Sequence, residues 1–169
     1  LRRAEREVVL CYPHTYRVAA ASLGLQVVYR ALNSRPGLSC QRAVLPDDFA
    51  APSGRDGKIQ QLRSLEHNMG LDQFDAIAIS ISYELDLPHL AAMIAAAGIS
   101  PLARERDPDD PPVIVGGPLT QSNALPLGVF ADVVAIGEAE DVLEDLAAWL
   151  EAGANRAELM TLALGREGL

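Results

Sequence analysis

Cysteine is scarce in this chain of 169 residues, and the motifs that depend on it are missing. The two cysteines, Cys11 and Cys40, are far apart, and neither a Cys-x-x-Cys nor a His-x-x-x-His spacing occurs. This absence argues against a structural zinc site. Cys11 lies in an apolar run, so we expect a buried thiol there rather than a disulfide or a metal ligand.

Positive charge and long apolar runs are also in short supply. The chain has 14 Lys and Arg residues against 23 Asp and Glu, and its formal net charge is −9 at pH 7. Without a basic footprint we expect neither a nucleic acid nor an anionic membrane as partner, although the acid surplus also fits a merely solubilising surface. No signal peptide and no run of about 18 apolar residues is present. The sequence therefore predicts a cytoplasmic protein.

Glycine-rich phosphate loops are absent as well. A dinucleotide site needs Gly-x-Gly-x-x-Gly directly after the first strand, but this chain reads Pro13-His14-Thr15-Tyr16-Arg17-Val18 and has no glycine there before Gly24. A Walker loop is missing, and so are the aspartates that a phosphoacceptor receiver carries at its strand ends. The sequence therefore favours neither a nucleotide site nor a receiver.

What the chain does contain is a regular alternation of apolar runs and helical patterns. Hydrophobic residues make up 49% of it, and its length suits one domain with a sizeable core. Strands are predicted at 8–12 (ended by Pro13), 40–45, 76–82, 113–115 and 133–136, and helices at 18–32, 59–69, 87–97, 139–150 and 155–164. This order predicts an α/β fold, a doubly wound, flavodoxin-like or Rossmann-like sheet of five parallel strands in the order 2-1-3-4-5.

The glycines that end two of these strands predict a binding crevice. The run 113–115 stops at Gly116-Gly117-Pro118, and the fifth strand runs into Gly137-Glu138. Ligands of doubly wound sheets bind beyond the carboxyl ends of the strands, and glycine lets the backbone approach a bulky ligand. The candidate cofactor-binding residues are Pro13, His14, Thr15, Tyr16, Ser80, Ser82, Tyr83, Glu84, Gly116, Gly117, Pro118, Asn123, Gly137 and Glu138.

The candidate residues also fit purely structural roles. Glycines form tight turns, the serines at 80 and 82 fit under a helix, Glu138 suits the positive end of a helix, and His14 fits an exposed loop. As a set, these glycines, hydroxyls, amide and acids suit a large, partly polar organic cofactor better than a triphosphate. We assign no catalytic residue and no metal ligand.

The order of several short motifs resembles a known family. The matching pieces are Val9 to Tyr16, Leu23-Gly24-Leu25-Gln26, Arg42 to Asp47, Ser64-Leu65-Glu66, Ser80 to Glu84, Gly116-Gly117-Pro118 with Ser122-Asn123, and Ile136-Gly137-Glu138. Together they make the chain resemble the amino-terminal cobalamin (vitamin B12)-binding-like domain of radical S-adenosylmethionine (radical SAM) proteins, over nearly its whole length.

The resemblance implies a fold like the cobalamin-binding domain of methionine synthase. It implies cobalamin at the carboxyl edge of the sheet with no protein histidine on cobalt, because Asp-x-His-x-x-Gly is missing from the first loop. It also implies that residues 1–152 form the cobalamin-binding-like domain, and that residues 153–169 form a C-terminal helix or linker toward a downstream radical SAM domain. The iron–sulfur cluster and S-adenosylmethionine are expected only in that domain, because Cys-x-x-x-Cys-x-x-Cys is missing here. We therefore expect a radical SAM enzyme as parent and no activity from this chain alone.

Two other hypotheses stay open from the sequence. Where the family tends to read Gly-Met-Ser-Asn, this chain has Ala19-Ala20-Ala21-Ser22. That departure favours a docking or substrate-recognition domain of the same parent protein that does not hold cobalamin. A small flavodoxin-like hydrolase would instead need a nucleophile–histidine pair, and His14, His67 and His89 have no evident partner in the sequence.

Overall fold

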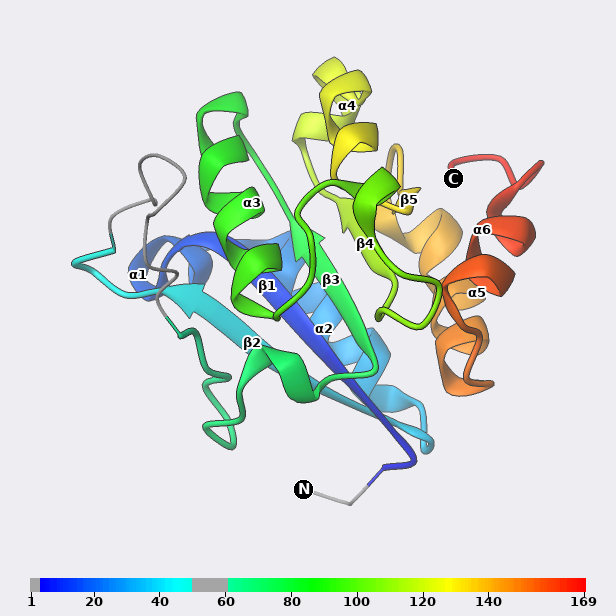
Figure 1. The fold of residues 1–169 in the computed structure, drawn as a ribbon, viewed down its shortest axis with the longest axis horizontal. Helices are drawn as coiled ribbons and strands as arrows, with labels where there is room; N and C mark the ends of the chain where they lie inside the picture. Colours follow the sequence, from blue (N-terminus) through cyan, green and yellow to red (C-terminus); the bar gives the residue numbers. More distant parts are fainter. Residues whose placement is uncertain (1–3, 50–60) are drawn as a thin grey trace.

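A sheet of five parallel strands forms the middle layer of the protein (Figure 1). The computed structural model describes residues 4–49 and 61–169. The strand order is β2-β1-β3-β4-β5, which confirms the predicted doubly wound topology. The strands are β1 (Arg6–Thr15), β2 (Leu38–Leu45), β3 (Ala76–Ser80), β4 (Val113–Gly116) and β5 (Val133–Val134).

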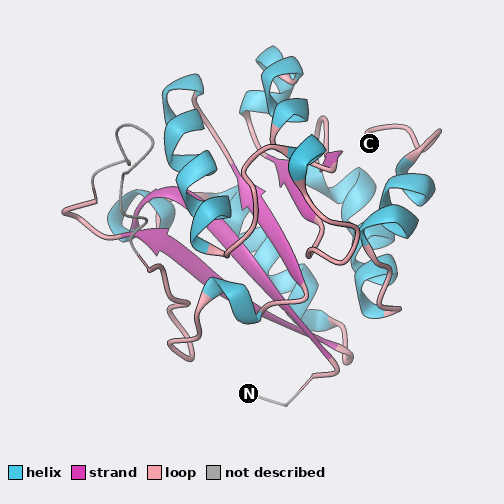
Figure 2. Cartoon of the chain, in the orientation of Figure 1, coloured by secondary structure: helices cyan, strands magenta, loops and turns pink. Residues whose placement is uncertain are grey.

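Helices cover both faces of the sheet (Figure 2). They are α1 (Tyr16–Ala19), α2 (Leu23–Ser34), α3 (Leu87–Ala96), α4 (Leu119–Asn123), α5 (Ala139–Glu151) and α6 (Arg156–Ala163). Short 3-10 turns occur at Leu71–Gln73, Glu84–Asp86, Ala103–Glu105 and Leu125–Val129. Among the described residues, none of these helices has the length and apolar character needed to cross a bilayer.

Successive residues of β1 point into two different cores. Val9 and Cys11 pack with residues of α3 on one side of the sheet. Val8 and Leu10 pack with residues of α2, α5 and α6 on the other side. A strand buried on both faces is apolar at every position, which explains why its sequence is a continuous apolar run.

β1 does not end at Pro13 as predicted but continues to Thr15. The register against β2 shifts there, since Tyr12 pairs with Val44 and Thr15 with Leu45. Pro13 and His14 therefore form an irregularity of the bulge type at the end of the strand. A proline is tolerated in a bulge because no backbone N–H is needed there for a hydrogen bond between the strands.

The prediction of a helix over 59–69 is wrong for residues 61–69. Ile59 lies outside the described residues. Instead, residues 61–70 form turns and an isolated antiparallel bridge between Arg63 and Gly70. This segment runs along the outer edge of β2. The Leu65 amide donates to the Arg42 carbonyl at 2.7 Å, and the Arg42 amide donates to the Glu66 carboxylate at 2.7 Å. The backbone groups of an edge strand need hydrogen-bond partners. Segment 61–70 supplies them from a turn, although its apolar residues have helical spacing.

Several other predicted elements end at different residues. The helix predicted over 18–32 is two helices, because Ser22 caps α2 by accepting a hydrogen bond from the Leu25 amide at 3.3 Å. β3 ends at Ser80, because the Ile81 carbonyl accepts from the Leu119 amide at the start of α4. β5 ends at Val134, and the Ile136 amide beyond it donates to the Gly168 carbonyl.

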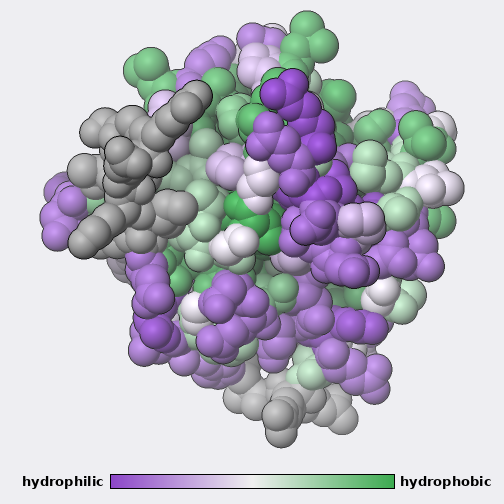
Figure 3. All heavy atoms as spheres, in the orientation of Figure 1, coloured by the Kyte–Doolittle hydropathy of each residue, from purple (hydrophilic) through white to green (hydrophobic). Residues whose placement is uncertain are grey.

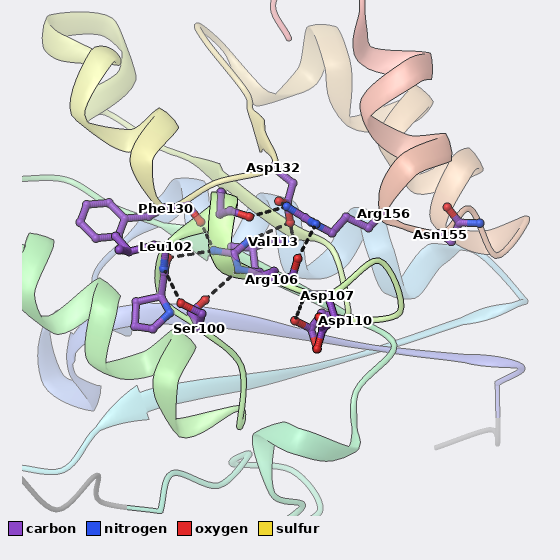
Figure 4. A network of polar contacts seen from close by, with 12 residues as sticks. Ser100, Leu102, Arg106, Asp107, Asp110, Val113, Phe130, Asp132, Asn155 and Arg156 are labelled. Atoms are coloured by element: carbon purple, nitrogen blue, oxygen red, sulfur yellow. Dashed lines mark hydrogen bonds and ion pairs between the residues drawn. The ribbon is translucent and has the colours of Figure 1, made fainter.

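A buried ionic network fixes the C-terminal segment onto the domain (Figure 4). The fully buried Asp132 carboxylate accepts from Arg106 and from Arg156 of α6, each at 2.8 Å. It also accepts from the Val113 amide at 2.9 Å. Arg106 donates further to the carbonyls of Ser100, Pro101 and Phe130. Burial lowers the pKa of Arg106, against the attraction of Asp132.

Candidate functional site

A groove opens at the carboxyl edge of the sheet and runs between α2 and α5. Its volume is about 370 Å³. Strand residues form its floor and helix residues form its two walls. The floor consists of Leu10, Ala78, Ile79, Ile114 and Ala135, and the walls of Leu23, Gly24, Val27, Val28 and Leu32 from α2 with Val142, Leu143, Leu146 and Leu150 from α5. This groove therefore lies where ligands of doubly wound folds bind.

The mouth of the groove contains part of the predicted site. The predicted residues that line it are Ser80, Gly116, Gly117, Pro118, Gly137 and Glu138. Ser22 and Gln121 line it as well, and the Gln121 amide donates to the Glu138 carboxylate at 3.4 Å. The mouth thus offers hydroxyl, amide and carboxylate groups beside glycines.

The other predicted residues lie at the end of β1 or follow β1, β3 and β4 at the same edge, but they do not line the groove. They are Pro13, His14, Thr15, Tyr16, Ser82, Tyr83, Glu84 and Asn123. Two of them already have partners. The Nδ1 atom of His14 accepts from the Thr15 amide at 2.8 Å, and the Ser82 hydroxyl lies 3.0 Å from the Tyr12 hydroxyl. Tyr16, Tyr83, Glu84 and Asn123 are exposed.

The glycines at the mouth differ in their backbone conformation and in the space that an added Cβ would have. Gly117 has a φ of +107°, and a Cβ there would lie 2.7 Å from the Ile81 carbonyl oxygen, so the fold itself requires glycine at this position. Gly137 has a φ of +96°, but a Cβ would meet no atom within 4 Å. Gly24, in the first turn of α2, has neither a positive φ nor an atom within 4 Å of an added Cβ. The fold therefore does not require glycine at position 24, and a side chain there would enter open space.

Sequence analysis missed the helical walls of the groove. α2 buries Leu25 and Leu32 against the sheet, yet Leu23 and Val27 on the same helix are exposed. These two residues are four positions apart, so they lie on one face of the helix. An apolar pair outside the core face was a signal in the sequence, but it cannot be interpreted before the orientation of the helix is known.

The segment Ala19 to Ser22 lies beside the mouth. Ala19 is buried, and Ser22 both lines the groove and caps α2. Serine and asparagine are similarly good N-cap residues. Ser22 therefore begins α2 as an asparagine would and places a hydroxyl at the mouth.

The described parts of the chain contain neither an exposed thiol nor a cluster of metal-ligating residues. Burial raises the pKa of the thiols of Cys11 and Cys40, so neither provides a thiolate for catalysis or metal binding. No group of three or more His, Cys, Asp and Glu residues in residues 4–49 and 61–169 is placed to hold a metal ion. His89 faces the Phe49 ring and has its Nδ1 atom 3.9 Å from Asp86. This arrangement gives no support to the hydrolase hypothesis.

Large apolar side chains are exposed around the same edge of the sheet. They follow β1, β3, β4 and β5 and comprise Tyr16, Leu23, Tyr83, Leu85, Leu125 and Ile136. Leu85 and Leu125 are 88% and 90% exposed. In Figure 3, hydrophobic atoms appear at the upper edge of the molecule, where α3 and α4 stand in Figure 1. Other exposed apolar side chains, such as Leu65 and Leu164, occur elsewhere on the described surface.

Comparison with protein families gives a match that extends from α2 to the C-terminal segment. The family model described as "Radical SAM proteins, N-terminal" matches residues 24–168. The matched span contains most of the groove, including both helical walls from Gly24 onward, and it also contains α6. No curated protein matches the chain.

Proposed function

This chain belongs to the family of N-terminal domains of radical SAM proteins, and on that premise we propose that it binds cobalamin at the carboxyl edge of its sheet. In this proposal the domain presents the cofactor to a downstream radical SAM domain of the same protein. One observation carries the proposal: the groove between α2 and α5 opens at that edge, with glycines at its mouth and an apolar interior.

The residues at the mouth fit a large, partly polar cofactor. Gly116, Gly117 and Gly137 present backbone without side chains, and Ser80 and Glu138 supply hydrogen-bonding groups beside them. The exposed apolar residues of the same edge would contact the macrocycle and the catalytic domain. The first loop lacks Asp-x-His-x-x-Gly, so the proposal assigns no protein histidine to cobalt.

In this proposal the cofactor, this chain and the downstream domain have different roles. Bound cobalamin would supply carbon- or electron-transfer chemistry at its cobalt. This chain would bind the cofactor, orient it and exclude water from the part inside the groove. The iron–sulfur cluster and S-adenosylmethionine belong, in this proposal, to the downstream domain, because both thiols here are buried and protonated.

An absorbance titration tests the proposal directly. Hydroxocobalamin at fixed concentration is titrated with the purified chain, and the corrin bands are followed. We expect a saturable spectral change at one equivalent, because seating the cofactor against the edge alters its surroundings. A spectrum that the protein leaves unchanged would overturn the proposal for this chain.

A leucine at Gly24 tests whether the groove is the site. The new side chain enters free space at the groove, so we expect Gly24→Leu to fold normally and to bind hydroxocobalamin at least tenfold more weakly, owing to steric exclusion. Gly128→Leu is the matched control. Gly128 also has no positive φ and no atom within 4 Å of an added Cβ, but it does not line the groove. Equal weakening by both variants would contradict the assignment.

A second candidate function is a docking or substrate-recognition domain without cobalamin. The segment Ala19 to Ser22 favours it, because the mouth lacks the amide of the family pattern. The exposed leucines at 85 and 125 fit a protein partner equally well. If this function holds, the chain does not change the absorbance spectrum of hydroxocobalamin. Replacing Leu85 and Leu125 by serine then weakens the association of this chain with the remainder of the parent protein.

A further inference from the structure

The two helical walls of the groove are joined to each other at one end. α2 and α5 each follow a strand of the parallel sheet, so both helices begin at the carboxyl edge and end at the opposite, amino edge. Among the described residues, every hydrogen bond and ion pair that connects α5 with α2 or with the turn after it involves Arg35 or Gly37. Both residues follow the last turn of α2, at the end remote from the mouth.

Glu151, the last residue of α5, makes two of these contacts. Its Oε1 atom accepts a hydrogen bond from the Gly37 amide at 2.9 Å, and its Oε2 atom lies 3.5 Å from the Nε atom of Arg35. A Cβ at Gly37 would lie 2.8 Å from the Cγ atom of Glu151, so the absence of a side chain at position 37 admits the glutamate. The side chains of Arg35 and Glu151 are 21% and 30% exposed, so water screens their pairing only in part.

The other connection between the walls is weaker. Glu144, two turns earlier on α5, lies 3.3 Å from the Nη1 atom of Arg35, but its side chain is 84% exposed. An ion pair in such a position contributes little, because solvent screens it. Toward the mouth the walls are aliphatic, and Leu23 at the start of α2 is 82% exposed. In the described parts of the chain, polar contacts therefore hold α2 and α5 together only beyond the C-terminal end of α2, and chiefly through Glu151.

We propose that Glu151 is a positioning residue for cofactor binding, which sets the separation of α2 and α5 through Gly37 and Arg35. This inference rests on the proposed function. Glu151 does not line the groove, so it acts on a ligand only through the two walls. Walls that are already held at the right separation need no ordering when a ligand binds, and a preorganised site binds more tightly for that reason.

Alanine variants of the two glutamates test the inference in equilibrium titrations of hydroxocobalamin with the purified chain. Glu151→Ala removes the hydrogen bond to Gly37 and the less exposed ion pair, so we expect binding about threefold weaker or more. Glu144→Ala is the matched control, since Glu144 pairs with the same arginine and does not line the groove, and we expect its affinity to stay unchanged. Unchanged affinity in Glu151→Ala, or equal weakening in both variants, overturns the inference and leaves the proposed function intact. A native chain that does not bind hydroxocobalamin overturns both.

Gly37→Ala gives a second readout, which a general loss of stability would not reproduce. The new methyl group would lie 2.8 Å from the Cγ atom of Glu151 and displace that side chain, so we expect this variant to bind hydroxocobalamin about as weakly as Glu151→Ala. In the double variant the displaced side chain is already gone, so Gly37→Ala is expected to cause no further loss of affinity. Losses that multiply in the double variant would mean that the two residues act independently, and that result overturns the inference.

Discussion

Gly117 connects the end of β4 to the start of α4 in a conformation that other residues rarely adopt. Its φ is +107°, and an added Cβ would lie 2.7 Å from the carbonyl oxygen and 2.9 Å from the nitrogen of Ile81. Left-handed backbone costs an L-residue roughly 1–2 kcal/mol, and overpacking adds about 1–3 kcal/mol. We expect Gly117→Ala to lower the free energy of unfolding by about 3 kcal/mol in urea denaturation.

Gly137→Ala separates the cost of the left-handed backbone from the cost of overpacking. Its φ is +96° but nothing lies within 4 Å of an added Cβ, so only the backbone term remains, at roughly 1–2 kcal/mol. Equal losses in both variants would show that the close approach to Ile81 is unimportant. A Gly117 variant that loses cofactor binding is therefore no evidence of ligand contact, unlike Gly24→Leu.

At the scale of elements, Asp132 connects the loop before β4, the start of β5 and the start of α6. Its carboxylate and the Arg106 guanidinium are both 0% exposed. Removing one partner of a buried ion pair leaves an uncompensated charge, which costs about 3–5 kcal/mol. We expect Asp132→Ala to reduce the free energy of unfolding by that amount, measured by urea denaturation monitored by circular dichroism.

Asp145→Ala is the control for this prediction. Asp145 pairs with Arg166, and both side chains are 40% exposed. Solvent screens such a pair, so its loss is expected to change stability by no more than about 1 kcal/mol. A similar loss in the two variants would mean that burial of the Asp132 network contributes little.

The same scale shows what sequence patterns reveal and what they do not. The strands around Ile77 and Ile114 were predictable, because a strand buried on both faces needs apolar residues throughout. The segment 61–70 was not, because Leu62, Leu65 and Met69 have helical spacing, while the Leu65 amide bonds to Arg42 of β2. Local periodicity contains no information about such a partner.

The candidate site was predictable only at the mouth of the groove. Glycines after β4 and β5 are visible in the sequence, because strands of a parallel sheet end at a common edge. The walls depend on how α2 and α5 pack across the sheet, which involves residues more than 100 positions apart, such as Arg35 and Glu144. Val27 and Leu143 therefore became recognisable as lining residues only with the fold in hand.

For the molecule as a whole, the C-terminal segment is part of the packed domain. Leu159 of α6 is 0% exposed in the core beside α2 and α5, and Arg156 pairs with the buried Asp132. Ending the chain after Ala154 removes both contributions. We expect the truncated chain to be less stable by more than about 3 kcal/mol or to aggregate, as measured by urea denaturation and gel filtration.

Leu159→Ala keeps this prediction testable if the truncated chain does not fold. Truncating a fully buried leucine costs about 2–5 kcal/mol. A truncated chain with unchanged stability, or a Leu159→Ala variant with no loss, would mean that α6 rests on the domain without supporting it.

The covering of the β2 edge has a consequence for how such a protein is made. The Leu65 amide and the Glu66 carboxylate bond the backbone of Arg42, and at the opposite side of the sheet the Ile136 amide bonds Gly168. Exposed β-edges recruit strands from other molecules, above all while a polypeptide is incomplete. An N-terminal domain leaves the ribosome first and waits for the remainder of its polypeptide. Because its own segments bond part of both flanks of the sheet, fewer free backbone groups are left there to pair with another chain.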